Sequence, residues 1–456
     1  MTPTRLGLWK NRAARFLTGA GATLSGAFLG ILRNKWLALH LHASGLGVLA
    51  QVTSGQIWLG TLAGMGLSLP VARAIGAAGG LGDPATARRT IWTALSLVGI
   101  GSSAVAAVGL LFARPISTAL LGTPDHALLV QISMLGVTGV ALQGILSGLF
   151  AGRSDIGANL ALSLGGGTAA VLVTWALVPR LGLAGGALGA AVLAPAGVAV
   201  ALFFRRRSYA GVFTPKPERP FDPALARSII GIGAAALLLS LVDLGTMLSV
   251  RAHYLRVNGI AANGLLQAAL SLSQQVGAVF GTYISSYAFG KVSAIASAAG
   301  SGGVRAYTRK QWTPFLLLAA VTVAAAMVAA TPLLHLLYSS RFDPARPMVA
   351  WALVGEFCRV GMIGWAVGAL PLGGARLWVP IGLAPPAGLA ISYAVLANTG
   401  AGVVSLPLAY LASGFVSLCF GGIAMSRAGV APARRDIALA LACAAALAAL
   451  AARVAR

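Results

Sequence analysis

Charged residues are scarce in this chain, and acidic residues are the scarcest of all. Only 9% of the 456 residues are charged, with 9 Asp and Glu against 33 Lys and Arg. Soluble domains carry roughly a quarter charged residues, so this composition excludes a soluble globular protein. Hydrophobic residues make up 58% of the chain. The composition therefore predicts an all-α polytopic membrane protein with little chain outside the bilayer.

The features that mark common enzyme and cofactor classes are also missing. The three cysteines, Cys358, Cys419 and Cys443, lie in apolar segments without paired spacing, which predicts inert packing residues. The glycine-rich stretches 78–89 and 300–303 lack the Gly-Lys-Ser/Thr ending of a phosphate loop. We expect no ATP site, no metal site and no cofactor, and no nucleophile–base pair indicates an enzyme.

The distribution of the net charge of +24 indicates membrane topology rather than nucleic-acid binding. Cationic residues gather in alternate loops, about twice as many at one set of helix ends as at the other, and no basic domain stands apart. The positive-inside rule then predicts a cytoplasmic N-terminus. Lys10, Arg12 and Arg15 precede a segment too long for a signal-peptide core, so we expect a retained first helix.

Apolar runs predict two six-helix bundles, at 1–204 and 225–426. The stretch 205–224, part of the proline-rich and basic segment 205–227, is expected to be a cytoplasmic linker. The tail 427–456 contains an alanine-rich stretch, 435–452, whose composition leaves open whether it crosses the membrane as a thirteenth helix. The twelve predicted helices are 14–40, 46–70, 90–113, 126–150, 156–179, 182–204, 225–250, 262–290, 312–338, 346–370, 377–397 and 402–425.

A faint internal repeat supports two related halves. "GVLAQVTSGQIWLG" at 47–60 aligns with "GLLQAALSLSQQVG" at 264–277 at an offset of 217. "GLAGGALGAA" at 182–191 meets "GAGVVSLPLA" at 400–409 at an offset of 218. An even number of crossings per half predicts a pseudo-twofold axis along the membrane normal.

Cations in the first helix of each half are the principal candidate site. Arg33 and Lys35 lie in "RNKWLALHLHASGLGVLAQ", about nine residues or roughly 14 Å before the helix end. Arginine at such depth costs about 2.5–3.5 kcal/mol, which favours a water-filled cationic cavity between the halves. At the repeat offset Arg33 falls on Arg251. The alternative is that these side chains are interfacial anchors that snorkel to the membrane surface.

Three further charges fall inside predicted spans. Glu356 and Arg359 in "WALVGEFCRVGMIGW" lie three residues apart on one helical face. They either neutralise each other or place Arg359 in the cavity with Glu356 as an ion-coupling group. Asp243 in "LLSLVDLGTMLSV" is a candidate for carrying a coupling ion, and pairing with an arginine is its alternative role.

The opening of the chain resembles the Wzx-type polysaccharide flippases of the multidrug/oligosaccharidyl-lipid/polysaccharide exporter superfamily. The resemblance rests on the cationic first helix, then "LALHLHASGLGVLAQ" and "LAGMGLSLPVARAIG", with "GLAGGALGAAV" and the basic 205–227 segment further on. "HLHAS" departs from the Gly-Pro turn that relatives tend to have, and a thirteenth helix departs from the usual twelve.

The resemblance implies a flippase working by alternating access in the bacterial inner membrane. It implies that undecaprenyl-pyrophosphate-linked oligosaccharide passes from the cytoplasmic to the outer leaflet, past Arg33, Lys35, Arg251 and Arg359. An H⁺ or Na⁺ gradient, polysaccharide polymerase machinery and membrane lipids are the expected partners, with the chain acting as a monomer. The alternatives are a cation-coupled multidrug or metabolite exporter, or a membrane oligosaccharide polymerase or ligase.

Overall fold

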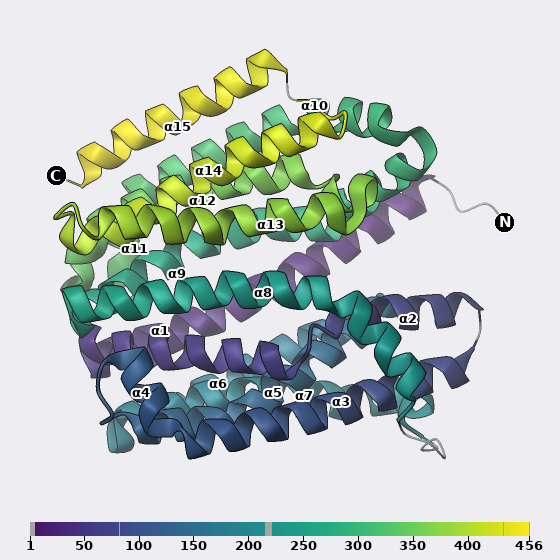
Figure 1. Ribbon diagram of the computed structural model, residues 1–456, viewed down its shortest axis with the longest axis horizontal. Coiled ribbons are helices and arrows are strands. Elements are labelled where there is room, and N and C mark those ends of the chain that lie inside the picture. The colour runs from purple at the N-terminus through teal and green to yellow at the C-terminus, as the bar shows by residue number, and fades with distance from the viewer. Residues whose placement is uncertain (1–4, 82, 215–220, 432, 456) are drawn as a thin grey trace. The chain divides into compact units, whose positions relative to one another are not determined.

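The computed structural model describes residues 5–81, 83–214, 221–431 and 433–455, and within these ranges every regular element is helical. The fold is therefore all-α, as predicted. The elements, shown in Figure 1, are α1 (Arg5–Ala63), α2 (Ser68–Leu81), α3 (Pro84–Leu111), α4 (Ala113–Leu121), α5 (Ala127–Gly152), α6 (Ile156–Leu181), α7 (Leu183–Phe213), α8 (Pro223–Asn258), α9 (Ile260–Tyr283), η1 (Ile284–Ala288), α10 (Phe289–Val328), α11 (Ala330–Leu337), η2 (Ser340–Ala345), α12 (Arg346–Ala366), α13 (Ala369–Leu396), η3 (Gly402–Val404), α14 (Ser405–Arg427) and α15 (Arg434–Val454).

The helices form two compact units. The first contains the chain up to Leu41 together with Val48–Leu248, and the second contains His42–Gly47 and Ser249–Arg456. The chain changes unit inside α1 and inside α8 rather than in a loop. The predicted division at 205–224 stays a prediction, and residues 215–220 of it lie outside the described residues. The first residues of the expected linker are helical, because α7 continues through Phe213.

Small residues let the helices of the first unit approach closely. A Cβ on Gly166 of α6 would lie 2.3 Å from the Leu193 carbonyl of α7, and one on Gly197 would lie 2.4 Å from the Leu162 carbonyl. Such contacts are the usual basis of helix association in membranes, where burial of apolar surface contributes little. The core between α2, α3 and α5 is filled by fully buried Ile91, Val137 and Phe150.

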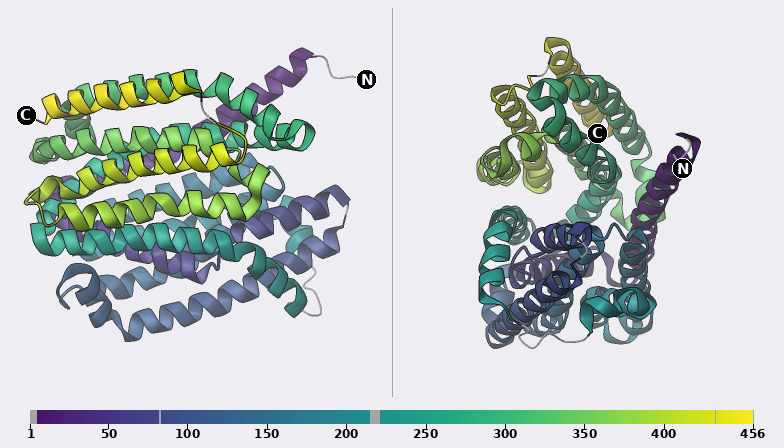
Figure 2. Two further views of the ribbon diagram at one scale, coloured as in Figure 1. Left: turned by 45° about the horizontal axis from the view of Figure 1, so that its top comes forward. Right: turned by 90° about the vertical axis from the view of Figure 1, so that its right-hand side faces the viewer.

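The second unit is built around α12. This helix contacts α9, α10, α14 and α15. The helix α14 also packs along α13, and both are yellow-green ribbons in Figure 2. Leu353 and Phe357 of α12 are fully buried. Gly355 and Gly414 let α12 and α14 meet, because a Cβ on Gly414 would lie 2.5 Å from the Gly355 carbonyl. The side chain of Glu356 on α12, 8% exposed, is therefore enclosed by protein rather than by lipid.

The number of helices that could cross a membrane is close to the predicted twelve but not equal to it. Among the described residues, 10 helices are long and apolar enough to cross a bilayer, or 11 if the bent pair Phe28–Ala63 and Ser68–Ala78 counts as one span. The second predicted helix, 46–70, is bent by 46° at this break. The expectation of a loop between 290 and 312 was wrong, since α10 covers this region and turns at Gly300 (φ 58, ψ −153).

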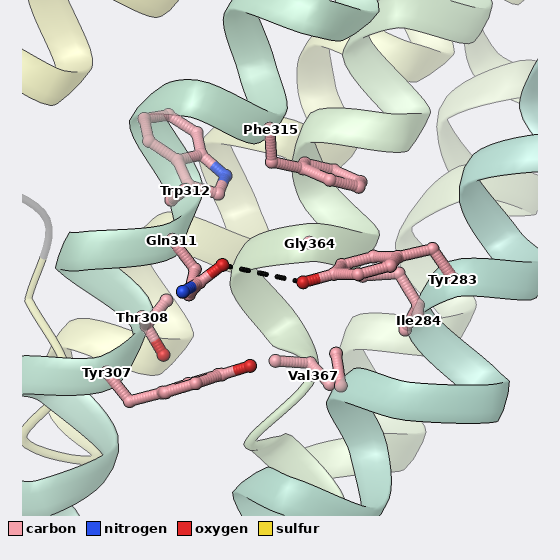
Figure 3. Close-up of a pocket in the computed structure, with 10 residues that line it drawn as sticks. Tyr283, Ile284, Tyr307, Thr308, Gln311, Trp312, Phe315, Gly364 and Val367 are labelled. Carbon is pink, nitrogen blue, oxygen red and sulfur yellow. Dashed lines mark hydrogen bonds between the residues drawn. The ribbon is translucent and has the colours of Figure 1, made fainter. Parts of the chain in front are cut away.

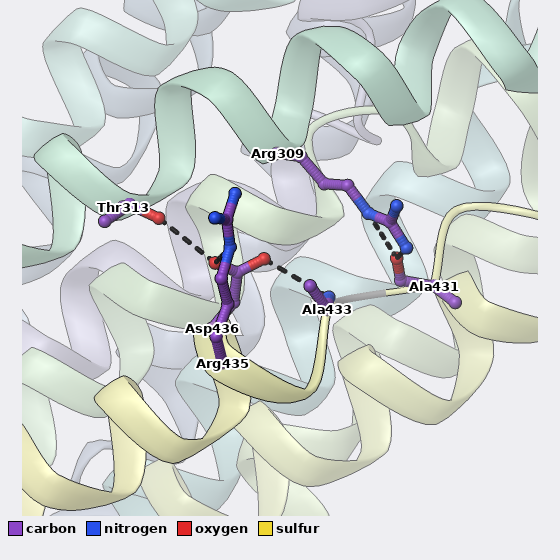
Figure 4. A network of polar contacts seen from close by, with 6 residues as sticks. All are labelled: Arg309, Thr313, Ala431, Ala433, Arg435 and Asp436. Atoms are coloured by element: carbon purple, nitrogen blue, oxygen red, sulfur yellow. Dashed lines mark hydrogen bonds and ion pairs between the residues drawn. The ribbon is translucent and has the colours of Figure 1, made fainter.

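The C-terminal helix α15 is tied to α10 by a polar network (Figure 4). Thr313 donates to Asp436 Oδ1 at 3.1 Å, and Asp436 Oδ2 accepts from the Ala433 amide at 3.2 Å. The Arg309 guanidinium donates twice to the Ala431 carbonyl. The segment Arg435–Val454 is long and apolar enough to cross a bilayer, and that it does so stays a prediction.

Candidate transport sites

The first helix of the chain ends at a sharp break. His42 has φ 56 and ψ −168 inside α1, so the helical hydrogen-bond ladder is interrupted there and two helical limbs meet. A positive φ is uncommon for a residue other than glycine. Arg33 thus lies in the first limb, nine residues before the break, and its depth in the membrane stays a prediction.

Arg33 presents an unused hydrogen-bond donor inside the first unit. Its Nε is buried and has no hydrogen-bond partner among the described residues, and the same is true of Trp36 Nε1. Residues three apart share one helical face, so both N–H groups belong to the same side of α1. The Trp36 ring is held against His40 (centroids 4.1 Å apart) and Trp175 of α6 (5.7 Å). An anionic ligand would satisfy both donors.

Lys35 and Arg33 do not share a helical face. Positions two apart on an α-helix point to different sides, and both side chains are half-buried. On the helical face of Arg33 the neighbouring side chain is therefore Trp36, and Lys35 lies on another face. That Lys35 binds substrate stays a prediction.

Arg251 is buried in the second unit and supports a turn of the chain. It is only 4% exposed, and α8 continues to Asn258, so it does not snorkel from a helix end. Its Nε and Nη2 both donate to Asn263 Oδ1 at 3.2 Å. Asn263 in turn donates to the Gly47 carbonyl at 2.8 Å. Arg251 therefore positions Asn263, which holds the segment 42–47 against α9.

Glu356 forms a buried polar cluster with a tyrosine from another helix. Glu356 of α12 is 8% exposed, and Tyr410 of α14 donates to its Oε2 at 2.5 Å. The Arg359 guanidinium lies 5.0 Å above the Tyr410 ring, so the acid and the base flank one aromatic side chain. A Cβ on Gly277 of α9 would fall on Glu356 Oε1, so a glycine is required there.

The contacts of this cluster stabilise a buried carboxylate. A buried carboxylate is costly unless it is paired and hydrogen-bonded, and here the tyrosine hydroxyl and the nearby guanidinium supply both. The predicted placement of Glu356 and Arg359 on one face agrees with the cluster, while their roles in coupling and substrate binding stay predictions.

Asp243 lies in the first unit, on the part of α8 that packs against the second limb of α1. Trp58 Nε1 donates to the Leu241 carbonyl at 3.0 Å, and a Cβ on Gly245 would lie 2.9 Å from the same Nε1. Asp243 is half-buried between these two contact points. The structure thus places Asp243 and Arg33 in one unit, and Arg251, Glu356 and Arg359 in the other.

Three supporting residues escaped the sequence analysis. Trp36 carried a usable signal, since it lies three residues after Arg33 on the same helical face. Tyr410 and Asn263 carried none, because their partners Glu356 and Gly47 are 54 and 216 residues away. Such pairs are set by helix packing and not by local pattern.

The chain is similar in sequence to curated flippases. It is 28% identical over 344 residues to the "Lipid III flippase" of Escherichia coli (strain K12), a match covering 75% of this chain and 81% of that protein. The Shigella flexneri protein of the same name matches to the same extent. No family model matches the sequence.

Solved transporters share the fold. An inward-facing multidrug resistance MATE family transporter of the MOP superfamily superposes with a TM-score of 0.72 at 14% identity, covering 90% of this chain and 99% of that one. An outward-facing transporter of the same family gives 0.64 at 14% identity, with 91% and 95% covered. These relatives are transporters, which agrees with the expectation that the chain is not an enzyme.

Proposed function

We propose that this chain, a flippase-type member of the multidrug/oligosaccharidyl-lipid/polysaccharide exporter superfamily in the bacterial inner membrane, translocates undecaprenyl-pyrophosphate-linked oligosaccharide. In this proposal the lipid-linked head passes from the cytoplasmic to the outer leaflet by alternating access, and the N-terminus is cytoplasmic. The curated relatives are lipid III flippases, which supports a lipid-linked substrate. The sequence resemblance to Wzx-type flippases supports the oligosaccharide.

The observation that carries the proposal is the pair of unused donors on α1. Arg33 Nε and Trp36 Nε1 are buried without partners among the described residues, and an unmet buried donor costs about 1–3 kcal/mol. Phosphate oxygens are strong acceptors that arginine binds in a fixed geometry. A pyrophosphate at this face of α1 would satisfy both donors while the lipid anchor stays in the bilayer.

The direct test measures transport in reconstituted vesicles. Arg33→Ala is expected to reduce the initial flipping rate of a fluorescent pyrophosphate-linked lipid at least tenfold at equal protein incorporation. Arg114→Ala is the matched control, because Arg114 is exposed at the start of α4 in the same unit, and its rate should equal that of the wild type. Equal rates for Arg33→Ala and wild type would refute the role of Arg33.

Ion coupling is proposed for the acidic residues. Glu356 in its cluster and Asp243 on α8 would bind H⁺ or Na⁺ and release it during the cycle. Glu356→Gln keeps the shape and an acceptor for Tyr410 but carries no charge and cannot bind or release a proton. Transport by this variant should no longer respond to an imposed gradient, whereas an unchanged gradient response would exclude Glu356 from coupling. Asp243→Asn is tested in the same assay.

The fold also favours a second candidate function, a cation-coupled multidrug exporter. The structural neighbours are multidrug transporters, but at 14% identity they bear on the fold alone. Expression in a strain lacking its own exporters decides between the two. Resistance to cationic drugs without any effect on glycan export would favour the exporter. Glycan export that depends on Arg33 would favour the flippase.

A further inference from the structure

The C-terminal helix α15 leaves a groove open along the second unit. This helix packs on α10 and α12, and the space between it and α14 is a groove of about 450 Å³. Sites that hold small ligands have volumes of about 300–1,000 Å³. The groove is therefore large enough for a ligand, and all of its walls belong to one unit.

The floor of the groove is aromatic and fixed. Trp312 of α10 and Trp365 of α12 are buried and pack edge-on with ring centroids 5.0 Å apart, and Trp312 Nε1 donates to the Gly361 carbonyl at 3.0 Å. Trp312 also borders a second cavity beside Tyr283 and Phe315 (Figure 3), but this one holds only about 20 Å³, room for a water molecule. The groove, with its preformed apolar floor, binds a ligand at little cost in entropy.

The sides of the groove are apolar and accessible. Ile423 of α14 lies on one side, Ile437 and Leu441 of α15 lie on the other, and all three side chains are exposed. A Cβ added to Gly422 of α14 would meet no atom within 4 Å, so the groove is empty of protein atoms there. Exposed apolar surface of this kind marks a site of contact with a ligand or with the membrane.

The length of the groove matches one leaflet of a bilayer. It extends along α14 from Leu418 to Arg427, the last residue of that helix. Nine residues of α-helix span about 14 Å, which is close to half of the roughly 30 Å hydrocarbon core. A phospholipid acyl chain has this length, whereas an undecaprenyl chain is much longer and cannot be contained in the groove.

A single charge lies at the end of this apolar surface. Among the described residues that line the groove, Arg427 alone is charged, and its side chain is exposed. The neighbouring Ser426 hydroxyl already donates to the Gly422 carbonyl of its own helix at 2.7 Å. The groove therefore suits an amphiphile with an apolar chain and one anionic head, because a guanidinium binds phosphate oxygens through several N–H groups.

Two further arginines bring positive charge to the same end. Arg305 of α10 donates from Nε to the Gly429 carbonyl at 2.6 Å, and Arg309 donates twice to the Ala431 carbonyl. Both acceptors belong to the connection that directly follows Arg427. The two guanidinium groups thus fasten this connection to α10 and add their charge beside the end of the groove.

The positive charge at this end is not neutralised by acids. The segments 301–315 and 425–440 together contain six cations and one acid, Asp436. Asp436 is 1% exposed and already accepts from the Thr313 hydroxyl and the Ala433 amide. Basic pockets between membrane helices are typical binding sites for the heads of anionic lipids.

We propose that the groove binds one anionic phospholipid, with an acyl chain against Trp312 and Trp365 and the phosphate on Arg427. The bound lipid fills the space between α14 and α15 and stabilises the packing of the C-terminal helix. The site goes beyond the proposed function and does not depend on it, because its ligand is a component of the membrane and not the transported molecule.

Lipid binding is tested with the delipidated full-length chain by native mass spectrometry, in titrations with phosphatidylglycerol, phosphatidylcholine and undecaprenyl phosphate. The wild type should bind one phosphatidylglycerol about tenfold more tightly than phosphatidylcholine. Arg427→Gln should weaken phosphatidylglycerol binding about fivefold, the contribution of one arginine near the membrane surface, and leave phosphatidylcholine binding unchanged. The matched control is Arg346→Gln, at an exposed arginine at the other end of α12 from Trp365, which should keep the wild-type affinity.

A second variant tests the groove rather than the charge. Gly422→Leu places a side chain in the empty part of the groove without a clash of its Cβ, so the folded chain should lose saturable binding of phosphatidylglycerol. A ligand that binds the folded state raises the thermal unfolding midpoint, so phosphatidylglycerol should raise it for the wild type and not for Gly422→Leu. Gly281→Leu on α9, where a Cβ also meets no atom within 4 Å, should bind and respond as the wild type does.

Three outcomes would overturn the proposal. The first is equal affinity for phosphatidylglycerol and phosphatidylcholine, and the second is phosphatidylglycerol binding that neither Arg427→Gln nor Gly422→Leu weakens. The third is tighter binding of undecaprenyl phosphate that Gly422→Leu abolishes, since the groove would then hold a transported carrier. Failure of the flippase function appears in a different assay, the flipping rate of Arg33→Ala, and leaves these lipid affinities as they are.

Discussion

Gly47 and Gly264 lie against each other with no room for a side chain on either. A Cβ on Gly47 would be 2.8 Å from the Gly264 amide nitrogen and 2.3 Å from the Ile260 carbonyl, and one on Gly264 would meet the Ala43 carbonyl at 1.7 Å. These two glycines are the ones that the repeat aligns at an offset of 217.

This contact predicts that a methyl group added at Gly264 lowers the stability of the protein, whereas one added elsewhere on α9 does not. Gly264→Ala places a Cβ on the backbone carbonyl of Ala43, which cannot move without displacing the segment 42–47. We expect a loss of about 1–3 kcal/mol in unfolding free energy, seen as a lower thermal midpoint in detergent. Gly281→Ala, on the same helix with no atom within 4 Å of the new Cβ, should be neutral or stabilising. Equal midpoints for the two variants would contradict the contact.

The sequence predicted the helices well because apolar length alone defines a span. The break at His42 falls in the predicted interruption between 40 and 46, although there a residue other than glycine takes the positive φ. At Gly300 the sequence predicted a loop, marked by "GSGG", where the helix turns and continues. A hydropathy pattern does not distinguish a polar loop from a polar helix that turns and continues. Arginines such as Arg305 and Arg309 occur in loops and are equally favourable in a helix.

The candidate sites were predictable only where partners are local. The place of Arg33 within its helix followed from counting residues, and the shared face of Glu356 and Arg359 followed from helical periodicity. The roles of Arg251 and Tyr410 could not be foreseen. Arg251 donates to Asn263, which lies twelve residues later, after the turn between α8 and α9. Tyr410 donates to Glu356 from a different helix.

The unused indole donor on α1 gives a specific prediction for ligand affinity. Trp36→Phe keeps an aromatic ring against His40 and Trp175 but removes Nε1–H. The affinity for a pyrophosphate-linked lipid should fall about two- to tenfold, while in the unfolding free energy the loss of the unmet donor offsets part of the packing lost with the smaller ring. The measurement is a titration of the lipid in nanodiscs. The control is Trp175→Phe, at the more exposed of the two stacked tryptophans. A comparable loss of lipid affinity in this control would show that the effect of Trp36→Phe does not come from Trp36 Nε1.

The Glu356 cluster predicts that one hydroxyl contributes to the stability of the second unit. Tyr410→Phe leaves Glu356 buried without its 2.5 Å donor. Hydrogen bonds to charged groups contribute about 1.5–3 kcal/mol, so the unfolding free energy should fall by about that amount. Tyr393→Phe, a change at a buried tyrosine of α13, serves as the control. A stability equal to that of the control would show that Tyr410 does not support the carboxylate.

Asp83 caps the N-terminus of α3, just before the membrane-spanning part of that helix. Its Oδ2 accepts from the Thr86 hydroxyl at 2.5 Å, and its Oδ1 accepts from the Ala85 and Thr86 amides at 3.1 Å. These bonds, the one from the Thr86 hydroxyl first, favour the ionised form and hold the pKa of the Asp83 carboxyl below its usual range.

A lowered pKa in the folded state makes this cap sensitive to acid. The contribution of Asp83 is fully present above the unfolded-state pKa of about 3.9, and it is lost as pH falls through the lower folded-state value. The thermal midpoint of the wild type should therefore drop below about pH 4 more steeply than that of Asp83→Asn, which keeps a capping oxygen without titrating. Asp125→Asn, at an exposed carboxylate of the α4–α5 connection, should retain the wild-type slope. Parallel pH profiles for wild type and Asp83→Asn would mean that the cap is not linked to the charge of this carboxylate.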